Sequence, residues 1–210
     1  MTDWFRRKAW TKMDEEEFFI KLGRARKDSR PQYLKIQAIE LVSTKNKDLL
    51  KVAESLLNKL LTEYPDDNFN KSPALHTLGD IYRNLGIEIK AVDFYKQALD
   101  FETIYPNVKT QAYLDYAELI IKSKDTAKFG ELESILLERQ PNLLFPIDKY
   151  KVNSILSIIN KFNGKEEKAT LYAELAEQNA NKETSGLRYH KNLGVVTDRE
   201  NWLDKLVQNK

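Results

Sequence analysis

The residue types that most often carry catalysis or bind metals are sparse in this sequence. It contains two histidines, His76 and His190, and no cysteine. Neither histidine stands in the His-x3-His or His-Glu spacing that a zinc site on one helix would need. The sequence also lacks the glycine-rich loop of phosphate-binding proteins and the Gly-x-Ser-x-Gly turn of hydrolases. We therefore expect no catalytic residue, no bound metal and no cofactor.

Carboxylates are abundant, but abundance alone does not predict an enzyme. The chain has 32 Asp and Glu residues against 34 Lys and Arg residues. On helix surfaces such carboxylates are usually solvated or paired with a lysine four residues away. Catalysis would instead require acids gathered from distant parts of the chain in a deep, dry pocket. We expect a non-enzyme and keep a helical enzyme as an alternative.

Charge and hydropathy also limit the partners of the chain. The formal net charge is +2, which gives no strong field to attract nucleic acid. No apolar run approaches the ~20 residues of a membrane span, and the first ten residues lack the apolar core of a secretory signal. The absence of cysteine suits a reducing compartment. We expect a soluble cytoplasmic protein that binds neither nucleic acid nor membrane.

The stretch DWFRRKAW, residues 3–10, places three aromatic side chains beside three basic ones. Trp4, Phe5 and Trp10 are suited to inserting at a membrane interface or stacking on a nucleic acid. They are equally suited to folding back over the first helices, because aromatic side chains bury a large area at low entropic cost. We favour the second interpretation, while a contact surface at this segment stays open.

The elements that must position these residues are predicted to be helices throughout. Apolar residues recur at i, i+3 and i+4 spacing, and no β-type alternation competes. One example is the set Val52, Leu56, Leu57 and Leu60. Each of the six prolines is expected at a break between helices. A capping box at Thr11 and Asp14 is expected to begin the first helix. The predicted helices span residues 14–28, 31–44, 48–63, 73–85, 88–103, 109–123, 126–139, 147–162, 166–180, 185–193 and 198–208.

One spacing pattern stands out, and it runs Leu75-x2-Leu78-Gly79-x2-Tyr82-x8-Ala91-x3-Tyr95-x2-Ala98. Small residues at 79 and 91 are expected where two paired helices approach most closely, with tyrosines filling the space beside them. This pattern resembles the tetratricopeptide (TPR) repeat, a helix–turn–helix unit of about 34 residues. Weaker matches begin at Leu34, Tyr113 and Asn153.

The resemblance covers roughly residues 31–180 as about four helix pairs. It implies an all-α fold, a right-handed α-solenoid of antiparallel helix pairs within a single domain, residues 1–210. Residues 1–30 would supply an N-terminal segment and capping helix, and residues 181–210 C-terminal capping helices, because end repeats otherwise expose an apolar face. The chain also resembles small, little-characterised bacterial TPR proteins that begin with a WFRR-like segment, here Trp4 to Arg7. That likeness implies no activity.

The TPR resemblance further implies that first helices line a concave groove, where outward-facing residues contact a protein or peptide. Ile39 stands where a clamp for a peptide carboxylate would need Asn, which disfavours a chaperone-tail adaptor. The implied partner-binding residues are Lys35 in the first unit, His76, Asp80, Arg83 and Asn84 in the second, and Gln111, Leu114, Glu118 and Lys122 in the third.

We therefore favour two binding functions over an enzymatic one. The first is a non-catalytic scaffold that holds a peptide or protein partner in the groove. The second is an immunity-type protein that neutralises a cognate bacterial toxin by direct binding. The sequence leaves the partner, the biological process and the oligomeric state open.

Overall fold

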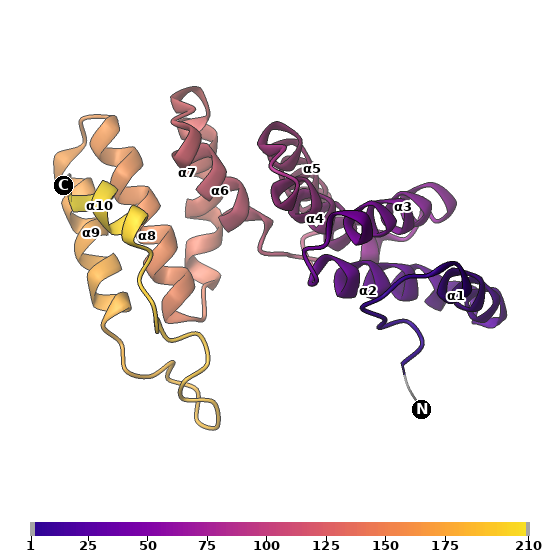
Figure 1. Ribbon diagram of the computed structural model, residues 1–210. Helices are drawn as coiled ribbons and strands as arrows, with labels where there is room; N and C mark the ends of the chain where they lie inside the picture. The colour runs from indigo at the N-terminus through magenta and orange to yellow at the C-terminus, as the bar shows by residue number, and fades with distance from the viewer. Residues whose placement is uncertain (1–2, 209–210) are drawn as a thin grey trace. The chain divides into compact units, whose positions relative to one another are not determined.

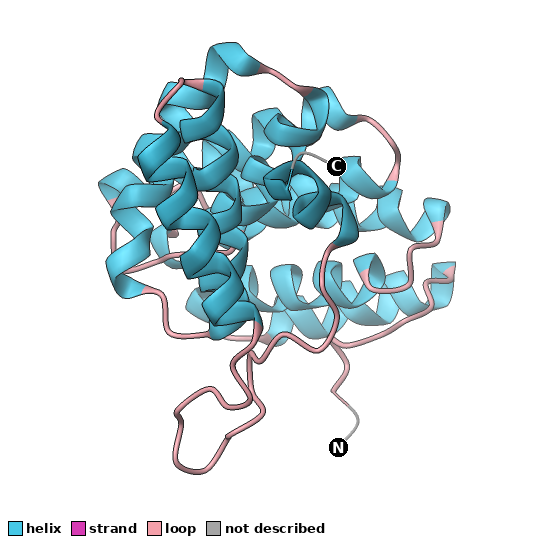
Figure 2. Ribbon diagram, turned by 90° about the vertical axis from the view of Figure 1, so that its left-hand side faces the viewer, coloured by secondary structure: helices cyan, strands magenta, loops and turns pink. Residues whose placement is uncertain are grey.

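The computed structural model describes residues 3–208, and every regular element within them is a helix, as Figure 2 shows. This confirms the prediction of an all-α protein. The chain divides into two compact units, Met1–Tyr116 and Ala117–Lys210; the predicted single domain stays a prediction. The described α-helices are α1 (Lys12–Arg24), α2 (Arg30–Val42), α3 (Lys47–Glu63), α4 (Asn68–Asn84), α5 (Glu88–Ile104), α6 (Ala112–Ser123), α7 (Phe129–Arg139), α8 (Pro146–Phe162), α9 (Glu166–Ala180) and α10 (Asn201–Gln208).

The helices of each unit pack against their neighbours in sequence order (Figure 1). In the first unit α2 packs on α3, and α4 packs on α5 while also contacting α2 and α3. In the second unit α8 packs on α9 and also contacts α7 and α10. Neighbour-to-neighbour packing of this kind is consistent with an α-solenoid. Among residues 3–208, no helix is both long enough and apolar enough to cross a membrane.

Side chains at the helix starts explain where several helices begin. The predicted capping box is present at α1: Thr11 accepts a hydrogen bond from the Asp14 backbone, while the Asp14 carboxylate accepts one from the Thr11 backbone. Asn46 caps α3 in a similar way by accepting hydrogen bonds from two backbone N–H groups. These caps satisfy donors that the first helical turn leaves without a partner.

The predicted start of the fourth helix at residue 73 is wrong, because α4 begins at Asn68. The Asp67 side chain caps the helix by accepting a hydrogen bond of 2.8 Å from the Asn70 backbone. Pro73 therefore lies inside the helix rather than at its first turn. Its ring removes one backbone donor, while the Thr77 hydroxyl donates to the Pro73 carbonyl at 2.8 Å.

The predicted helix at 185–193 is also wrong, since turns occupy this stretch between α9 and α10. Ser185 closes a loop by donating its backbone N–H to the Lys191 carbonyl at 2.7 Å and its hydroxyl to the His190 carbonyl at 2.8 Å. Gly186 and Gly194 adopt φ angles of 81° and 70°, in the left-handed region that ends helices. The helix expected at 198–208 is present as α10.

The N-terminal segment folds back onto the first helices, which confirms the favoured interpretation of its aromatic residues. The Trp4 ring lies 5.3 Å from Phe18 of α1 and 5.1 Å from Tyr33 of α2, measured between ring centroids. Phe5 and Trp10 also pack against the hydrophobic core of this unit. The buried side chain of Gln37 accepts a hydrogen bond from the Arg7 backbone N–H at 3.0 Å and donates to its carbonyl at 2.7 Å.

Candidate functional site

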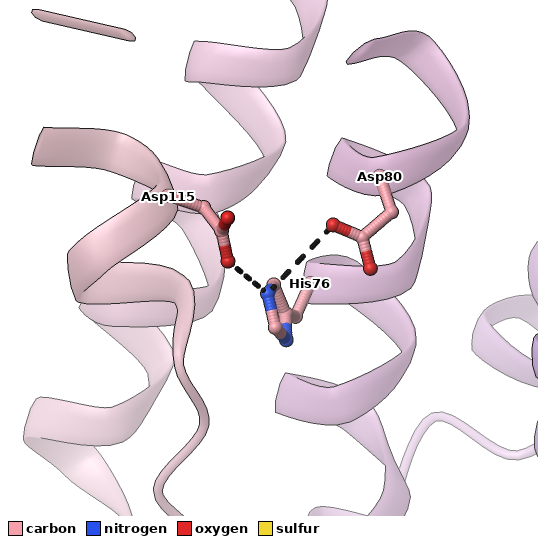
Figure 3. Close-up of side chains that lie close together, drawn as sticks. All are labelled: His76, Asp80 and Asp115. Atoms are coloured by element: carbon pink, nitrogen blue, oxygen red, sulfur yellow. Dashed lines mark hydrogen bonds and ion pairs between the residues drawn. The ribbon is translucent and has the colours of Figure 1, made fainter. Parts of the chain in front are cut away.

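Three of the predicted partner-binding residues lie on one face of α4 and meet an acid from α6. His76, Asp80 and Arg83 follow at i, i+4 and i+7, which places them one above another along a helix. Figure 3 shows His76 between the carboxylates of Asp80 and Asp115. We call His76, Asp80, Arg83, Asp115 and Tyr95, which supports them from α5, the His76 cluster.

The His76 ring joins the two carboxylates. Its Nε2 lies 2.9 Å from Oδ2 of Asp115 and 3.9 Å from Oδ1 of Asp80. Arg83 binds the other oxygen of Asp115, donating from Nη1 at 2.8 Å. The side chains of His76, Asp80 and Asp115 are 18 %, 36 % and 27 % exposed, so all three are partly buried.

Gly79 and Tyr95 fix the position of Asp80. A side-chain carbon at residue 79 would lie 2.3 Å from Cε1 of Tyr95, so only glycine admits the ring at this distance. The ring is fully buried, and its hydroxyl donates to Oδ1 of Asp80 at 2.8 Å. The Tyr95 and His76 rings also lie 5.6 Å apart, centroid to centroid. The close approach expected at Gly79 is thus confirmed, and it serves the cluster as well as the packing.

The electrostatics of the cluster favour protons on its titratable groups. Burial opposes charge on His76, but the hydrogen bond to Asp115 and the charges of Asp80 and Asp115 outweigh it, so the pKa of His76 is raised. Burial also raises the pKa of Asp80, against the opposing effects of His76 and Tyr95. The pKa of the Tyr95 hydroxyl is raised by burial and by the nearby Asp80 carboxylate.

The remaining predicted residues of the first unit make separate contacts. Lys35 lies with its Nζ 5.6 Å from the ring centroid of Phe69, and burial lowers the pKa of Lys35 despite the attraction of Asp67. Asn84 is exposed and donates to the Asp80 backbone carbonyl at 2.8 Å. Gln111 is exposed and Leu114 half-buried, just before and within the first turn of α6.

Glu118 and Lys122 belong to the second unit, where they form an ion pair one helical turn apart. The Lys122 Nζ lies 4.6 Å from the ring centroid of Trp202 in α10. The sequence predicts that Glu118 and Lys122 line the same groove as the residues of α4, and this stays a prediction.

The sequence did not identify Asp115 or Tyr95 as members of the site. Asp115 directly follows the predicted residue Leu114, but no local signal shows that its side chain meets α4. Tyr95 was predicted only as a packing residue, and its hydroxyl carries the additional contact to Asp80. Both assignments require knowing how three helices lie together.

Chemically, the His76 cluster offers an imidazole nitrogen and two carboxylates on partly exposed side chains. Such a set can exchange protons, hold a charged group of a partner or coordinate a cation. A scan against protein-family models, a search of curated proteins and a search of solved structures each found no match for this chain.

Proposed function

We propose that the chain is a non-catalytic scaffold of the cytoplasm that binds a peptide or protein partner. Its helix pairs would form a right-handed, TPR-like solenoid, and the partner would contact the exposed face of α4 and the start of α6. The main support is the shared, partly exposed face of α4 that carries His76, Asp80 and Arg83.

The contacts within the cluster suit recognition of a partner. Asp80 and Asp115 are each held by a donor on another helix, Tyr95 and Arg83 respectively. Side chains held in this way lose little conformational entropy when a partner binds. The exposed amides of Asn84 and Gln111 add donors and acceptors that a partner's backbone can use.

Site-specific photo-cross-linking in the native cell tests the location of this surface. A benzophenone amino acid replaces Asn84 in one variant and Gln111 in another, while a matched control carries it at Gln97, exposed on α5. We expect the same partner to be cross-linked from 84 and 111 and not from 97. Equal cross-linking from 97, or no protein cross-linked from either test position, would contradict the proposal.

The same experiment addresses the alternative function. An immunity-type protein would be cross-linked to a toxin, whereas a general scaffold would be cross-linked to a protein of another class. Melting curves of the three variants, compared with the unmodified chain, check that the replacements leave the fold intact.

A further inference from the structure

We propose that His76, Asp80 and Asp115 bind one divalent metal ion of the zinc class. This goes beyond the proposed function, and it replaces the expectation of no metal that the sequence spacing suggests. The three residues each offer one ligand atom, and these atoms lie within 4.8 Å of one another (Figure 3).

The spacing of the ligand atoms suits a small cation. Zinc binds histidine nitrogen and carboxylate oxygen at about 2.0–2.2 Å, which places tetrahedral ligands roughly 3.4 Å apart. The two separations from Nε2 of His76 are 2.9 Å to Asp115 and 3.9 Å to Asp80, on either side of that distance. Small rotations of the side chains would therefore place all three ligand atoms around one ion, which would replace the hydrogen bond between His76 and Asp115.

The groups around these ligands provide the supporting hydrogen bonds that metal sites need. The hydroxyl of Tyr95 donates to the Asp80 carboxylate, which keeps a second lone pair on the same oxygen for a metal. Arg83 donates to Oδ1 of Asp115, so Oδ2, which faces His76, is the oxygen oriented toward the ion. Outer partners of this kind orient ligands, and losing one typically lowers metal affinity by about 10–100-fold.

The ligand types determine which metal is expected. Calcium takes six to eight oxygen ligands and magnesium prefers oxygens with several waters, whereas an imidazole favours zinc and its transition-metal neighbours. A metal must displace the proton that the cluster favours on His76, so binding should strengthen as pH rises. Once His76 is neutral, the two carboxylates and the Arg83 cation leave the cluster with one net negative charge, which attracts a divalent cation. Three protein ligands leave at least one coordination position for water or for an acidic group of a partner.

Cobalt(II) is the direct probe, because its visible absorption reports the ligands around it. The untagged full-length chain is titrated with Co²⁺ after treatment with a chelator, and Zn²⁺ is then added to displace the cobalt. We expect one Co²⁺ per chain, absorption bands of a four- or five-coordinate ion, and complete loss of these bands on adding Zn²⁺. Absence of visible bands throughout the titration would overturn the proposal.

Variants identify the ligands. His76→Gln and Asp115→Asn should each weaken Co²⁺ binding at least about 100-fold, and Tyr95→Phe about tenfold. His190→Gln is the matched control, because it removes the other histidine from a loop of the second unit, and it should leave the affinity unchanged. Circular dichroism checks folding. If one of these ligand variants unfolds, Asp80→Asn replaces it as the test, because the asparagine oxygen can still accept the hydrogen bond from Tyr95. Unchanged affinity in a folded ligand variant, or equal loss in His190→Gln, would overturn the assignment.

Discussion

Replacing Gly79 with alanine tests the closest helix contact of the first unit. The added methyl carbon would lie 2.3 Å from Cε1 and 2.4 Å from Cδ1 of Tyr95, well inside the 3.4 Å at which ordinary contact begins. The Tyr95 ring is fully buried and its hydroxyl is bonded to Asp80, so it has no open space to enter. Either the two helices move apart or the hydrogen bond breaks.

With both the overpacking and the lost hydrogen bond, the free energy of unfolding should fall by about 1.5–5 kcal/mol. Overpacking of a filled core costs about 1–3 kcal/mol. Loss of the hydrogen bond from Tyr95 to the charged Asp80 would add about 1.5–3 kcal/mol. The gain in helix propensity from glycine to alanine offsets about 1 kcal/mol of this total.

Urea unfolding followed by circular dichroism measures the effect. The matched control is Gly23→Ala on α1, where an added carbon would meet nothing within 4 Å. This control should be neutral or stabilise by up to about 1 kcal/mol. Adding Tyr95→Leu to Gly79→Ala should recover part of the loss, giving a coupling energy of at least about 1 kcal/mol. A neutral Gly79→Ala, or strict additivity with Tyr95→Leu, would refute the contact.

Three further changes test other contacts. Gln37→Leu should leave the Arg7 backbone without its partners, destabilise the chain by about 1–3 kcal/mol and speed trypsin cleavage after Arg7. Hydrogen bonds from Arg199 are the largest cause of the lowered pKa of Glu177. The stabilising effect of Glu177 is therefore present above pH 4.5 and lost as pH falls through its pKa in the folded chain. Glu177→Gln should therefore lower the free energy of unfolding at pH 7, by less than about 1 kcal/mol because Glu177 is 56 % exposed. At pH 2 the substitution should have no effect. Urea unfolding at both pH values measures the difference. Pro73→Ala should stabilise α4 by about 1 kcal/mol, since it restores a backbone donor, and a lower melting temperature would contradict this.

Helix periodicity predicted the fold well because it reports burial directly. The residues at i, i+3 and i+4 in the segment from Val52 to Leu60 pack in the core as expected, with Leu56 and Leu60 fully or almost fully buried. The capping box at Thr11 also followed from local chemistry alone. Signals of this type act within one or two helical turns, so the sequence displays them.

The two wrong helix predictions, the start at residue 73 and the helix at 185–193, arose where nearby residues outweighed the local sequence signal. Pro73 suggested a helix start, but the Asp67 side chain caps the helix further upstream, so the proline lies inside it despite the backbone hydrogen bond that it cannot make. At 185–193 the apolar spacing suggested a helix, while the Ser185 hydrogen bonds and Gly194 hold a loop.

The candidate site was only half predictable for a different reason. His76, Asp80 and Arg83 could be assigned to one helix face, because that requires only the helical repeat. Their meeting with Asp115 and Tyr95 depends on the packing of α4 against other helices, which the spacing within one helix does not encode. The same limit applies to the zinc-type ligand set, whose third member comes from another helix.

The N-terminal segment has a consequence for any molecule that approaches the first two helices. Residues 3–10 occupy that surface much as a bound peptide would, with aromatic rings on the core and a backbone group held by Gln37. Because this segment is covalently joined to the helices that it covers, its effective concentration there is of the order of millimolar. Any molecule that binds this surface must therefore first displace the segment, and removing residues 1–10 would expose apolar side chains of α1 and α2 that the segment covers.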